Sequence, residues 1–492
     1  MAFNPCYVPN CIYRALTWMP PCAECLSRYC FEHGKHPLHE CWVRRRKGIR
    51  MGATLEGMNE PEVTQLLKLI DVDLIKDEVE NLRPGHTVVK IDKKPNAMDN
   101  INAYFGQFNL QIKINFDDST SWLMRIRRKA FIRPYPNEPL KVNLISEVAT
   151  CQALSQAGIK VPDSILRPGN SKLHPNVIYC YQTFIEGKSW DEFSPRYKPV
   201  QSMRNPAPEE PLSEKSNQHI IHIARWFIDL EKVKFHKIGS LTLSSDSSGK
   251  IEVGPLIERQ PTKTIPPYFD GPFSTLKARY LSSINTRLSA LIARTLVDPS
   301  MEIKLYLSLL ELRELVENDQ DLEQDKGPFY IRHADDHWDH TRTKDKGEIT
   351  GVIDWEWAYT TSKSEAFCSP MSFLPVEFHR GKNDIFALKE KSLIEAYQSL
   401  NRDDLIRYIK NGRKYQRLIH TLKCMSLNIM EFNATKRAFL GLPDPQGDND
   451  ENDKLPKTIV EWEVVMLEKW KDDEGLNYLL NNPVSVPELP EK

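Results

Sequence analysis

The sequence predicts a two-lobed α+β fold, in which a small lobe with an antiparallel sheet precedes a larger, mainly helical lobe, and a small zinc-binding domain precedes both. Cysteines and histidines cluster before residue 43, a strand pattern of period two follows near residue 110, and helical patterns dominate the second half. We therefore expect a zinc finger at 1–43, a basic linker at 44–58, the small lobe at 59–185 and the large lobe at 186–492.

The charge balance excludes several classes of partner. The 492 residues include 66 Lys plus Arg and 67 Asp plus Glu, so the net charge is -1. No global basic field attracts nucleic acid or an anionic membrane, and neither is an expected partner. No apolar run approaches the roughly 20 residues of a membrane helix, and no secretory signal is present. The expected location is cytoplasmic, with the nucleus as the alternative.

The N-terminal cysteine cluster points to zinc. Six of the ten cysteines lie in the first 41 residues, together with three histidines, His33, His36 and His39. Thiols and imidazoles at short spacing close tetrahedral zinc sites. A disulfide knot is the alternative, but it needs no histidines and suits a secreted chain. Metal binding would supply most of the folding energy of so small a domain.

The spacing resembles the AN-one-type zinc finger, chiefly in the knuckle Cys22-Ala-Glu-Cys25 and in YCFEHGKHPLHEC. Four residues separate the first two cysteines, where the family usually has two. The resemblance implies two structural zinc ions, and a protein as the partner of the finger. The implied ligands are Cys6, Cys11, Cys30 and His33 for one ion, and Cys22, Cys25, His39 and Cys41 for the other.

A basic run, Arg44 to Lys47 with Arg50, follows the finger. It is interpreted as a solvated linker, and the alternatives are a nuclear import signal or a site for nucleic acid or an acidic partner.

The small lobe begins with helical spacing over residues 62–82. Apolar residues then alternate from Leu110 to Phe116, a turn follows at 117–120, and a second strand returns over 122–126. Gly106, just before the first strand, is either a weak phosphate-loop signal or a bend. A helix over 143–159 carries Glu147, and a further strand leads through TFIEG to a turn at Gly187.

The densest polar stretch is residues 328–358. A short strand, Phe329 to Ile331, precedes a loop rich in Asp and His over 333–340. A hairpin then leads to Asp354 and folds it back beside His340 and near Asp335. Two carboxylates at one end of a hairpin suit a divalent cation and a proton acceptor. A hydrated surface loop is the alternative.

This stretch resembles the catalytic region of aminoglycoside phosphotransferases and choline kinases, particularly the fungal members, which have a protein-kinase-like fold. Those read His-Gly-Asp-Leu-His-Pro-x-Asn and, after a hairpin, Ile-Asp-Trp-Glu. Here residues 333–340 read HADDHWDH and residues 353–357 read IDWEW. Similar segments, including TFIEGKSW and FHKIGSL, extend the resemblance over about 100–375. The resemblance implies an ATP-dependent phosphotransferase that acts on a small-molecule hydroxyl acceptor.

The resemblance also implies residue roles. Asp335 would be the catalytic aspartate, and Asp354 would hold magnesium against the ATP phosphates. Arg125 would contact phosphate, Glu147 would be its helix partner, and Gly106 would belong to the phosphate loop. Backbone groups of Phe184 and Ile185 would meet the adenine, and His340 stands where the family has a metal-binding Asn.

Four departures from the family pattern leave a second function open. Arg125 replaces a lysine, Ala334 a glycine, Asp336 an apolar residue and His340 an asparagine. Imidazole is a poor ligand for magnesium, so manganese or zinc is an alternative metal. The second hypothesis is a pseudokinase-like scaffold, in which the zinc finger and the nucleotide-binding fold serve protein binding.

Overall fold

The computed structural model divides the chain into two compact units. The sheet unit contains residues 1–148 and 163–184, and the helical unit contains residues 149–162 and 185–492. The predicted zinc finger and basic linker lie outside the described residues. Those described are 63–92, 108–128, 137–190, 211–244, 249–259, 263, 266–297, 299–335, 340–344, 347–423, 427–447, 450 and 453–483.

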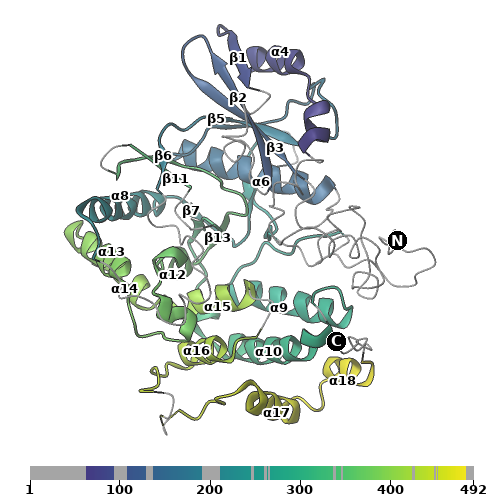
Figure 1. Cartoon of the computed structure of the whole chain (residues 1–492), viewed down its shortest axis with the longest axis vertical. Helices are drawn as coiled ribbons and strands as arrows, with labels where there is room; N and C mark the ends of the chain where they lie inside the picture. The colour runs from purple at the N-terminus through teal and green to yellow at the C-terminus, as the bar shows by residue number, and fades with distance from the viewer. Residues whose placement is uncertain are drawn as a thin grey trace, which may run out of the picture. The chain divides into compact units, whose positions relative to one another are not determined.

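The sheet unit has five antiparallel strands in the order β1-β2-β3-β5-β4 (Figure 1). This confirms the small antiparallel sheet that the strand pattern predicts. Helix α6 crosses the division between the units at residue 148. The elements are α4 (Val72–Leu82), β1 (Val88–Asp92), β2 (Asn109–Phe116), β3 (Ser121–Arg127), α6 (Asn137–Gln156), β4 (Ser164–Leu166) and β5 (Tyr179–Thr183).

Strand β2 follows the predicted alternation. Leu110, Ile112, Ile114 and Phe116 are at most 3% exposed, whereas the residues between them are half-buried. The apolar face packs with residues of β3 and α4 in one core. The turn to β3 is closed by the Asp118 carboxylate, which accepts hydrogen bonds from the backbone and hydroxyl of Thr120. The apolar face of β2 and the turn after it therefore together specify the register in which β2 pairs with β3.

The helical spacing predicted over residues 62–82 is divided between two helices. Residues 63–68 form the first, and α4 begins at Val72. The Asp71 carboxylate accepts hydrogen bonds from the backbone N–H groups of Asp73 and Leu74, which starts a new helix there. The spacing did not reveal this division, because apolar residues continue at helical intervals across the N-cap at Asp71.

The helical unit contains short antiparallel strands and most of the helices. Its N-terminal elements are β6 (Lys188–Ser189), α8 (Glu214–Leu230), β7 (Lys234–Phe235), β8 (Leu241–Leu243), β9 (Ile251–Val253), α9 (Leu276–Ile292), α10 (Pro299–Asn318), α11 (Asp321–Gln324), β10 (Phe329–Arg332), β11 (Thr341–Thr343), β12 (Ile349–Val352) and β13 (Tyr359–Thr361). Its C-terminal elements are α12 (Lys363–Ala366), the 3-10 helices η4 (Met371–Phe373) and η5 (Val376–Arg380), α13 (Leu388–Ser399), α14 (Asp403–Lys410), α15 (Arg413–Lys423), α16 (Ile429–Leu440), α17 (Ile459–Lys469) and α18 (Glu474–Asn481).

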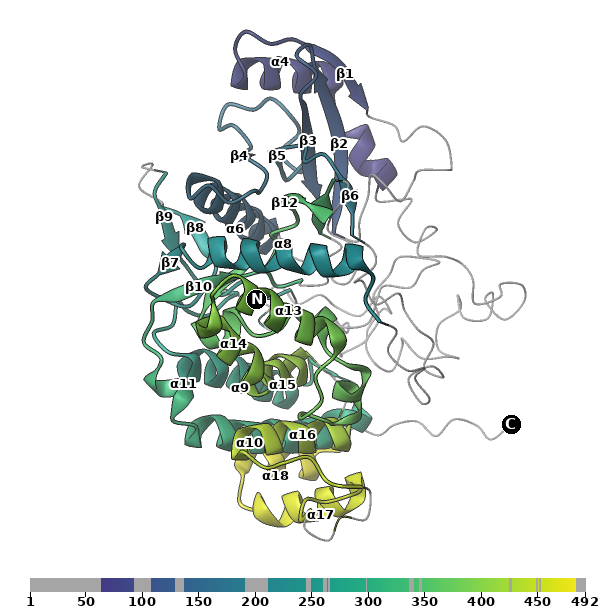
Figure 2. The same cartoon turned by 90° about the vertical axis from the view of Figure 1, so that its left-hand side faces the viewer.

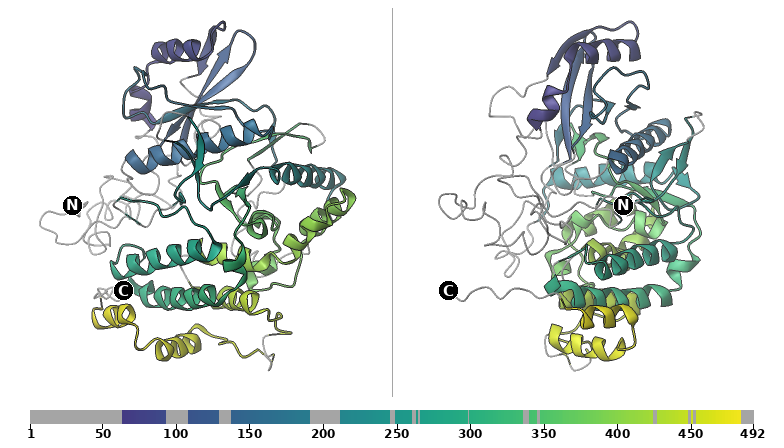
Figure 3. Two further views of the ribbon diagram at one scale, coloured as in Figure 1. Left: turned by 180° about the vertical axis from the view of Figure 1, so that it is seen from behind. Right: turned by 90° about the vertical axis from the view of Figure 1, so that its right-hand side faces the viewer.

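Two hydrophobic clusters hold the helical unit together. One centres on Trp355 and includes buried faces of α8, α13 and α14. The other joins α9, α10 and the C-terminal helices, which lie beside one another in Figure 2 and in both views of Figure 3. Leu305, Leu309, Leu312 and Val316 recur at helical spacing along α10 and are buried in this second cluster, so they form its core face.

Among the described residues, no helix combines the length and the apolar character that crossing a bilayer requires.

Candidate functional site

The sheet unit brings the predicted Arg125 and Glu147 together. The Arg125 Nε atom lies 3.2 Å from Glu147 Oε1, and the two side chains are 5% and 0% exposed. Arg125 lies on the central strand β3, and Glu147 lies on α6. The expected pairing of a strand cation with a helix carboxylate is therefore present in the structure.

Arg127 is a further member of this cluster that the sequence interpretation missed. Its Nη2 atom is 2.5 Å from Glu147 Oε2, and its Nη1 atom donates to Asn109 Oδ1. The Gln182 side chain donates to Glu147 Oε1, the oxygen that also lies near Arg125 Nε, over 3.1 Å. Residues two apart in a strand share a face, so the period of β3 was the signal that could have identified Arg127.

Burial explains why Glu147 needs so many partners. A carboxylate removed from water is stable only when it is paired and hydrogen-bonded, and three donor side chains contact this one. The arrangement fixes the Arg125 guanidinium against the sheet. A planar guanidinium of fixed orientation suits recognition of a phosphate group.

Part of the predicted adenine-contacting segment, which is Phe184 and Ile185, already uses a backbone hydrogen bond within the fold. The Phe184 backbone N–H donates to the Ser121 carbonyl over 2.9 Å, which extends the pairing of β5 with β3. The Lys113 ammonium lies 3.9 Å from the centre of the Phe184 ring. Ile185, the first residue of the helical unit after this strand, is half-buried. Gly106 lies outside the described residues.

In the helical unit, His340 lies between the two predicted aspartates. Its Nε2 atom is 3.4 Å from Asp335 Oδ2, and its Nδ1 atom is 3.6 Å from Asp354 Oδ2. The three side chains are between 18% and 27% exposed. The hairpin thus brings Asp354 beside His340, and His340 beside Asp335, as the sequence predicts. Asp336, His337, Trp338 and Asp339 lie outside the described residues.

Backbone hydrogen bonds of Ile353 position the cluster. Its N–H donates to the His340 carbonyl over 3.0 Å, which continues the β11–β12 hairpin by one bond. Its carbonyl accepts from His333 Nε2 over 3.1 Å. Since both bonds come from the residue before Asp354, the hairpin register determines which side chains meet that carboxylate.

His333 connects this hairpin to Asp335. The backbone N–H of Asp335 donates to His333 Nδ1, so the proton of the neutral ring lies on Nε2. Burial lowers the pKa of His333, and the neighbouring His340 lowers it further. A neutral His333 therefore accepts at one nitrogen and donates at the other, and thereby holds Asp335 and Ile353 in place.

The backbone of Asp354 is left-handed, with φ of 65°. This region is costly for residues other than glycine, asparagine and aspartate. Unusual backbone conformations persist where the surrounding structure requires them, and they occur often at functional sites. The observation therefore agrees with a special role for the Asp354 carboxylate.

Strand β10, which leads into the loop, is anchored by a buried network around Glu365. The Arg332 guanidinium donates to the Glu365 carbonyl, and the Glu365 carboxylate pairs with Arg279 at 2.7 Å. The Tyr280 and Tyr359 hydroxyls donate to the same carboxylate. The charges of Arg279 and Arg332 outweigh burial and lower the pKa of Glu365. The position of Asp335 therefore depends on a rigid support.

A cavity of about 40 Å³ lies beside the loop. Asp335 and His340 line it together with His333 and the apolar side chains of Trp226 and Phe227. Asp354 is not among its lining residues. The volume admits a few water molecules and is too small for a nucleotide.

The donor atoms only partly fit a magnesium ion. The Asp335 and Asp354 carboxylates supply the oxygen atoms that magnesium prefers, but an imidazole stands between them. His340 also presents a different nitrogen to each carboxylate, so no one nitrogen atom faces both acids. Manganese fits the carboxylates equally well, and imidazole favours zinc. The predicted zinc ligands near the N-terminus lie outside the described residues.

Comparisons with known proteins identify no family for this chain. No protein-family model matches the chain, and a search of curated protein sequences finds no similar protein. The similar solved structures include an aminoglycoside phosphotransferase of type 4-Ia, which is 12% identical with a TM-score of 0.38. That match covers 75% of this chain and 96% of the phosphotransferase.

Two further structures are similar at the same level. A thermostable variant of that phosphotransferase, in complex with AMP-PNP and hygromycin B, is 13% identical with a TM-score of 0.36, and the match covers 74% of this chain and 95% of the variant. An ethanolamine kinase from Plasmodium vivax is 13% identical with a TM-score of 0.35. The match covers 80% of this chain and 91% of the ethanolamine kinase. Likenesses this low transfer no function, which has to be argued from the residues.

Proposed function

We propose that this chain is an ATP-dependent phosphotransferase that acts on a hydroxyl group of a small molecule. The observation that carries the proposal is the arrangement of Asp335 and Asp354 on either side of His340, within a loop and hairpin that resemble the catalytic region of aminoglycoside phosphotransferases. The buried Arg125–Glu147 pair also supports it, because the same resemblance predicts that pair.

The residue roles follow from chemistry and position. Asp335 accepts the proton of the acceptor hydroxyl, and the hydroxyl oxygen attacks the terminal phosphorus of ATP. The bond from that phosphorus to the bridging oxygen breaks, and ADP leaves with the bond's electrons. Asp354 holds the divalent cation, which when bound neutralises the negative charge of the phosphates. Arg125 contacts a phosphate, and Glu147 with Arg127 keeps its guanidinium oriented. His333 is a positioning residue that holds Asp335.

The N-terminal segment is proposed to be a two-zinc module that binds a protein partner. The proposal rests on the cysteine and histidine spacing. The measurement is the zinc content of a fragment of residues 1–58, which holds the predicted finger and linker, tested for metal-dependent folding by circular dichroism. Close to two ions are expected, and Cys25→Ser should unfold the fragment. A metal-free fragment with paired disulfides would contradict the proposal.

The second candidate function is a scaffold that binds without phosphoryl transfer. It is favoured by the imidazole of His340, which stands between the two carboxylates where an oxygen ligand is expected. In this case both the zinc module and the kinase-like units would serve protein binding.

An assay with ATP and a panel of small hydroxyl compounds separates the two functions. ATP with magnesium or manganese should raise the melting temperature of the full chain, and turnover should follow in the presence of an acceptor. Asp335→Asn should retain nucleotide binding, and its turnover should fall by at least about 100-fold, because the Asp335 carboxylate acts on the acceptor hydroxyl and not on ATP. Asp354→Asn should lose metal-dependent nucleotide binding, because the phosphates lose their bound cation.

Each outcome has a definite meaning. If the wild type binds ATP without any turnover, and Asp335→Asn binds ATP equally well, the result would support the scaffold function. No stabilisation by ATP with any divalent ion would contradict both the phosphotransferase and a nucleotide-binding scaffold. The exposed pair of Lys160 and Glu348 supplies a control variant, Glu348→Gln, whose nucleotide binding should equal that of the wild type.

A further inference from the structure

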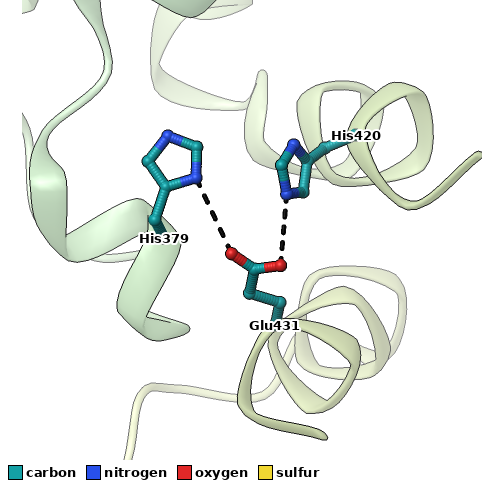
Figure 4. A group of neighbouring side chains, drawn as sticks. All are labelled: His379, His420 and Glu431. Atoms are coloured by element: carbon teal, nitrogen blue, oxygen red, sulfur yellow. Dashed lines mark hydrogen bonds and ion pairs between the residues drawn. The ribbon is translucent and has the colours of Figure 1, made fainter. Parts of the chain in front are cut away.

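Three side chains of the helical unit, outside the candidate site, converge from three different elements. His379 comes from η5, His420 from the last turn of α15, and Glu431 from the first turn of α16. Figure 4 shows both imidazole rings directed at the single carboxylate. One potential ligand atom from each residue lies within 4.8 Å of the other two.

The distances approach those of a metal site. His420 Nε2 lies 3.2 Å from one carboxylate oxygen of Glu431, and His379 Nδ1 lies 3.7 Å from the other. Zinc bonds of about 2.0–2.1 Å in a tetrahedron place neighbouring ligand atoms roughly 3.3 Å apart. Small side-chain adjustments would therefore allow one ion to contact all three residues.

The backbone holds the three elements close together. Gly381, directly after η5, has a φ of 79°, and a Cβ atom there would lie 2.6 Å from the Met430 carbonyl oxygen. Glycine is thus required for η5 to approach the start of α16. At that start, the Asn428 side chain accepts a hydrogen bond from the Met430 N–H. The approach of His379 to Glu431 therefore follows from the backbone.

An aromatic side chain supports both imidazoles. The Phe378 ring packs edge-on against the rings of His379 and His420, with centroid distances of 5.3 and 5.6 Å. The Arg417 guanidinium covers the same phenyl ring at 3.7 Å from its centroid. These contacts restrict the rotamers of the two histidines, which lowers the entropy that metal binding would cost.

Exposure and charge favour a cation with one open position. The His379 side chain is 41% exposed, whereas those of His420 and Glu431 are 20% and 18% exposed. The cluster thus offers one charged carboxylate, two imidazoles and a side open to solvent.

We propose that His379, His420 and Glu431 form a binding site for a divalent transition-metal ion of the zinc class, with water or an external ligand in the fourth position. Two imidazoles and one carboxylate suit zinc and its neighbours, and they do not suit magnesium. The bound ion would join η5 to the α15–α16 pair.

One other histidine–carboxylate group has the required spacing among the described residues: His86, Asp117 and Asp118. It carries no such proposal, because the Asp118 carboxylate already pairs with both terminal nitrogens of Arg83, at 3.0 and 2.6 Å. A cation there would have to displace a guanidinium.

The test measures zinc in the full chain, where the N-terminal cysteines are expected to hold two further ions. Protein equilibrated with buffered zinc should contain one ion per chain less in His379→Gln and in His420→Gln than in the wild type. The affinity for the lost ion should fall by at least about tenfold, as measured by competition with a chelator. His236→Gln, at an exposed histidine of the same unit, is the matched control and should keep the wild-type content.

Cobalt distinguishes this site from the cysteine sites. Cobalt at His379, His420 and Glu431 should give visible absorption without sulfur-to-metal charge transfer, and His379→Gln should remove that part of the spectrum. Because His379 is the most exposed of the three, this variant is the least demanding for folding. Equal zinc content and equal cobalt spectra in the wild type, His379→Gln and the control would overturn the proposal and leave the cluster as an ion pair only.

Discussion

Two charged clusters of this chain differ in how they are held. Arg125, Arg127 and Glu147 are almost fully buried, and contacts of 2.5–3.3 Å join them. Asp335, His340 and Asp354 are partly exposed, with separations of 3.4 and 3.6 Å. The first cluster depends on its internal pairing, whereas the second retains access to water. Changes in the first should therefore affect stability most, and changes in the second should affect ligand binding most.

The largest expected effect is on stability, in Glu147→Ala. Removing this carboxylate leaves two arginines buried without it, and breaking a buried ion pair costs about 3–5 kcal/mol. Hydrogen exchange at the backbone amides of β2 and β3 measures the free energy of opening of the sheet unit directly. Glu348→Ala, which breaks the exposed pair with Lys160, should cost less than about 1 kcal/mol. If Glu147→Ala and Glu348→Ala lowered stability by similar amounts, the buried cluster would not be more important for stability than an exposed ion pair.

The next effect concerns a buried histidine, His219, and acid stability. Its ring stacks on Trp190 with centroids 4.2 Å apart, and its Nδ1 donates to the Gly347 carbonyl. Burial lowers the pKa of His219 from 6.5 to about 4. A histidine with a lowered pKa in the folded state binds fewer protons than in the unfolded state. The contribution of neutral His219 to the free energy of unfolding is therefore complete above pH 6.5. About 3 kcal/mol of that free energy is lost as the pH falls toward 4.

Denaturant unfolding at pH 7 and pH 4.5 tests this expectation. His219→Asn keeps a donor for Gly347 and removes the titrating group, so its stability should fall less between the two pH values than that of the wild type. His236→Asn changes an exposed histidine and should reproduce the wild-type dependence. An identical pH dependence in all three proteins would show that His219 does not set the acid limit.

The smallest effect is expected in the partly exposed cluster, from His340→Asn. In an active enzyme adapted to His340, the amide oxygen should shift the metal preference toward magnesium by about tenfold, because magnesium prefers oxygen ligands. In an inactive scaffold, the change should either raise magnesium-dependent turnover or leave it at zero. Titration of turnover with magnesium and manganese makes the measurement. Measurable magnesium-dependent turnover that is equal before and after the change would show that residue 340 is not a metal ligand.

Local patterns predicted the parts of the fold in which side-chain period and backbone agree. The alternation from Leu110 to Phe116 gave strand β2, and the polar turn after it gave the hairpin with β3. The break at Asp71 was missed because one side chain starts a new helix inside an uninterrupted apolar pattern. An N-cap depends on hydrogen bonds between one side chain and nearby backbone N–H groups, and the spacing of apolar residues carries no information about these bonds.

The candidate site was predictable where a motif fixes the order of residues. Asp335, His340 and Asp354 follow from a loop and a short hairpin, and Glu147 follows from its place on a helix. Arg127 and Gln182 were missed because they reach Glu147 through the pairing of β3 with β5 and the placement of α6. Pairing between distant segments leaves little trace in one sequence.

The left-handed backbone at Asp354 has a consequence for mutational tolerance. If every amino acid is tried at this position, protein abundance and activity should rank the substitutions differently. Glycine and asparagine accept a φ of 65° and should give abundant protein that lacks the carboxylate proposed to bind the metal. Glutamate keeps the charge but fits this conformation poorly, and β-branched residues should be the least abundant. The backbone thus narrows the residues that can both fold and function at position 354 almost to aspartate alone.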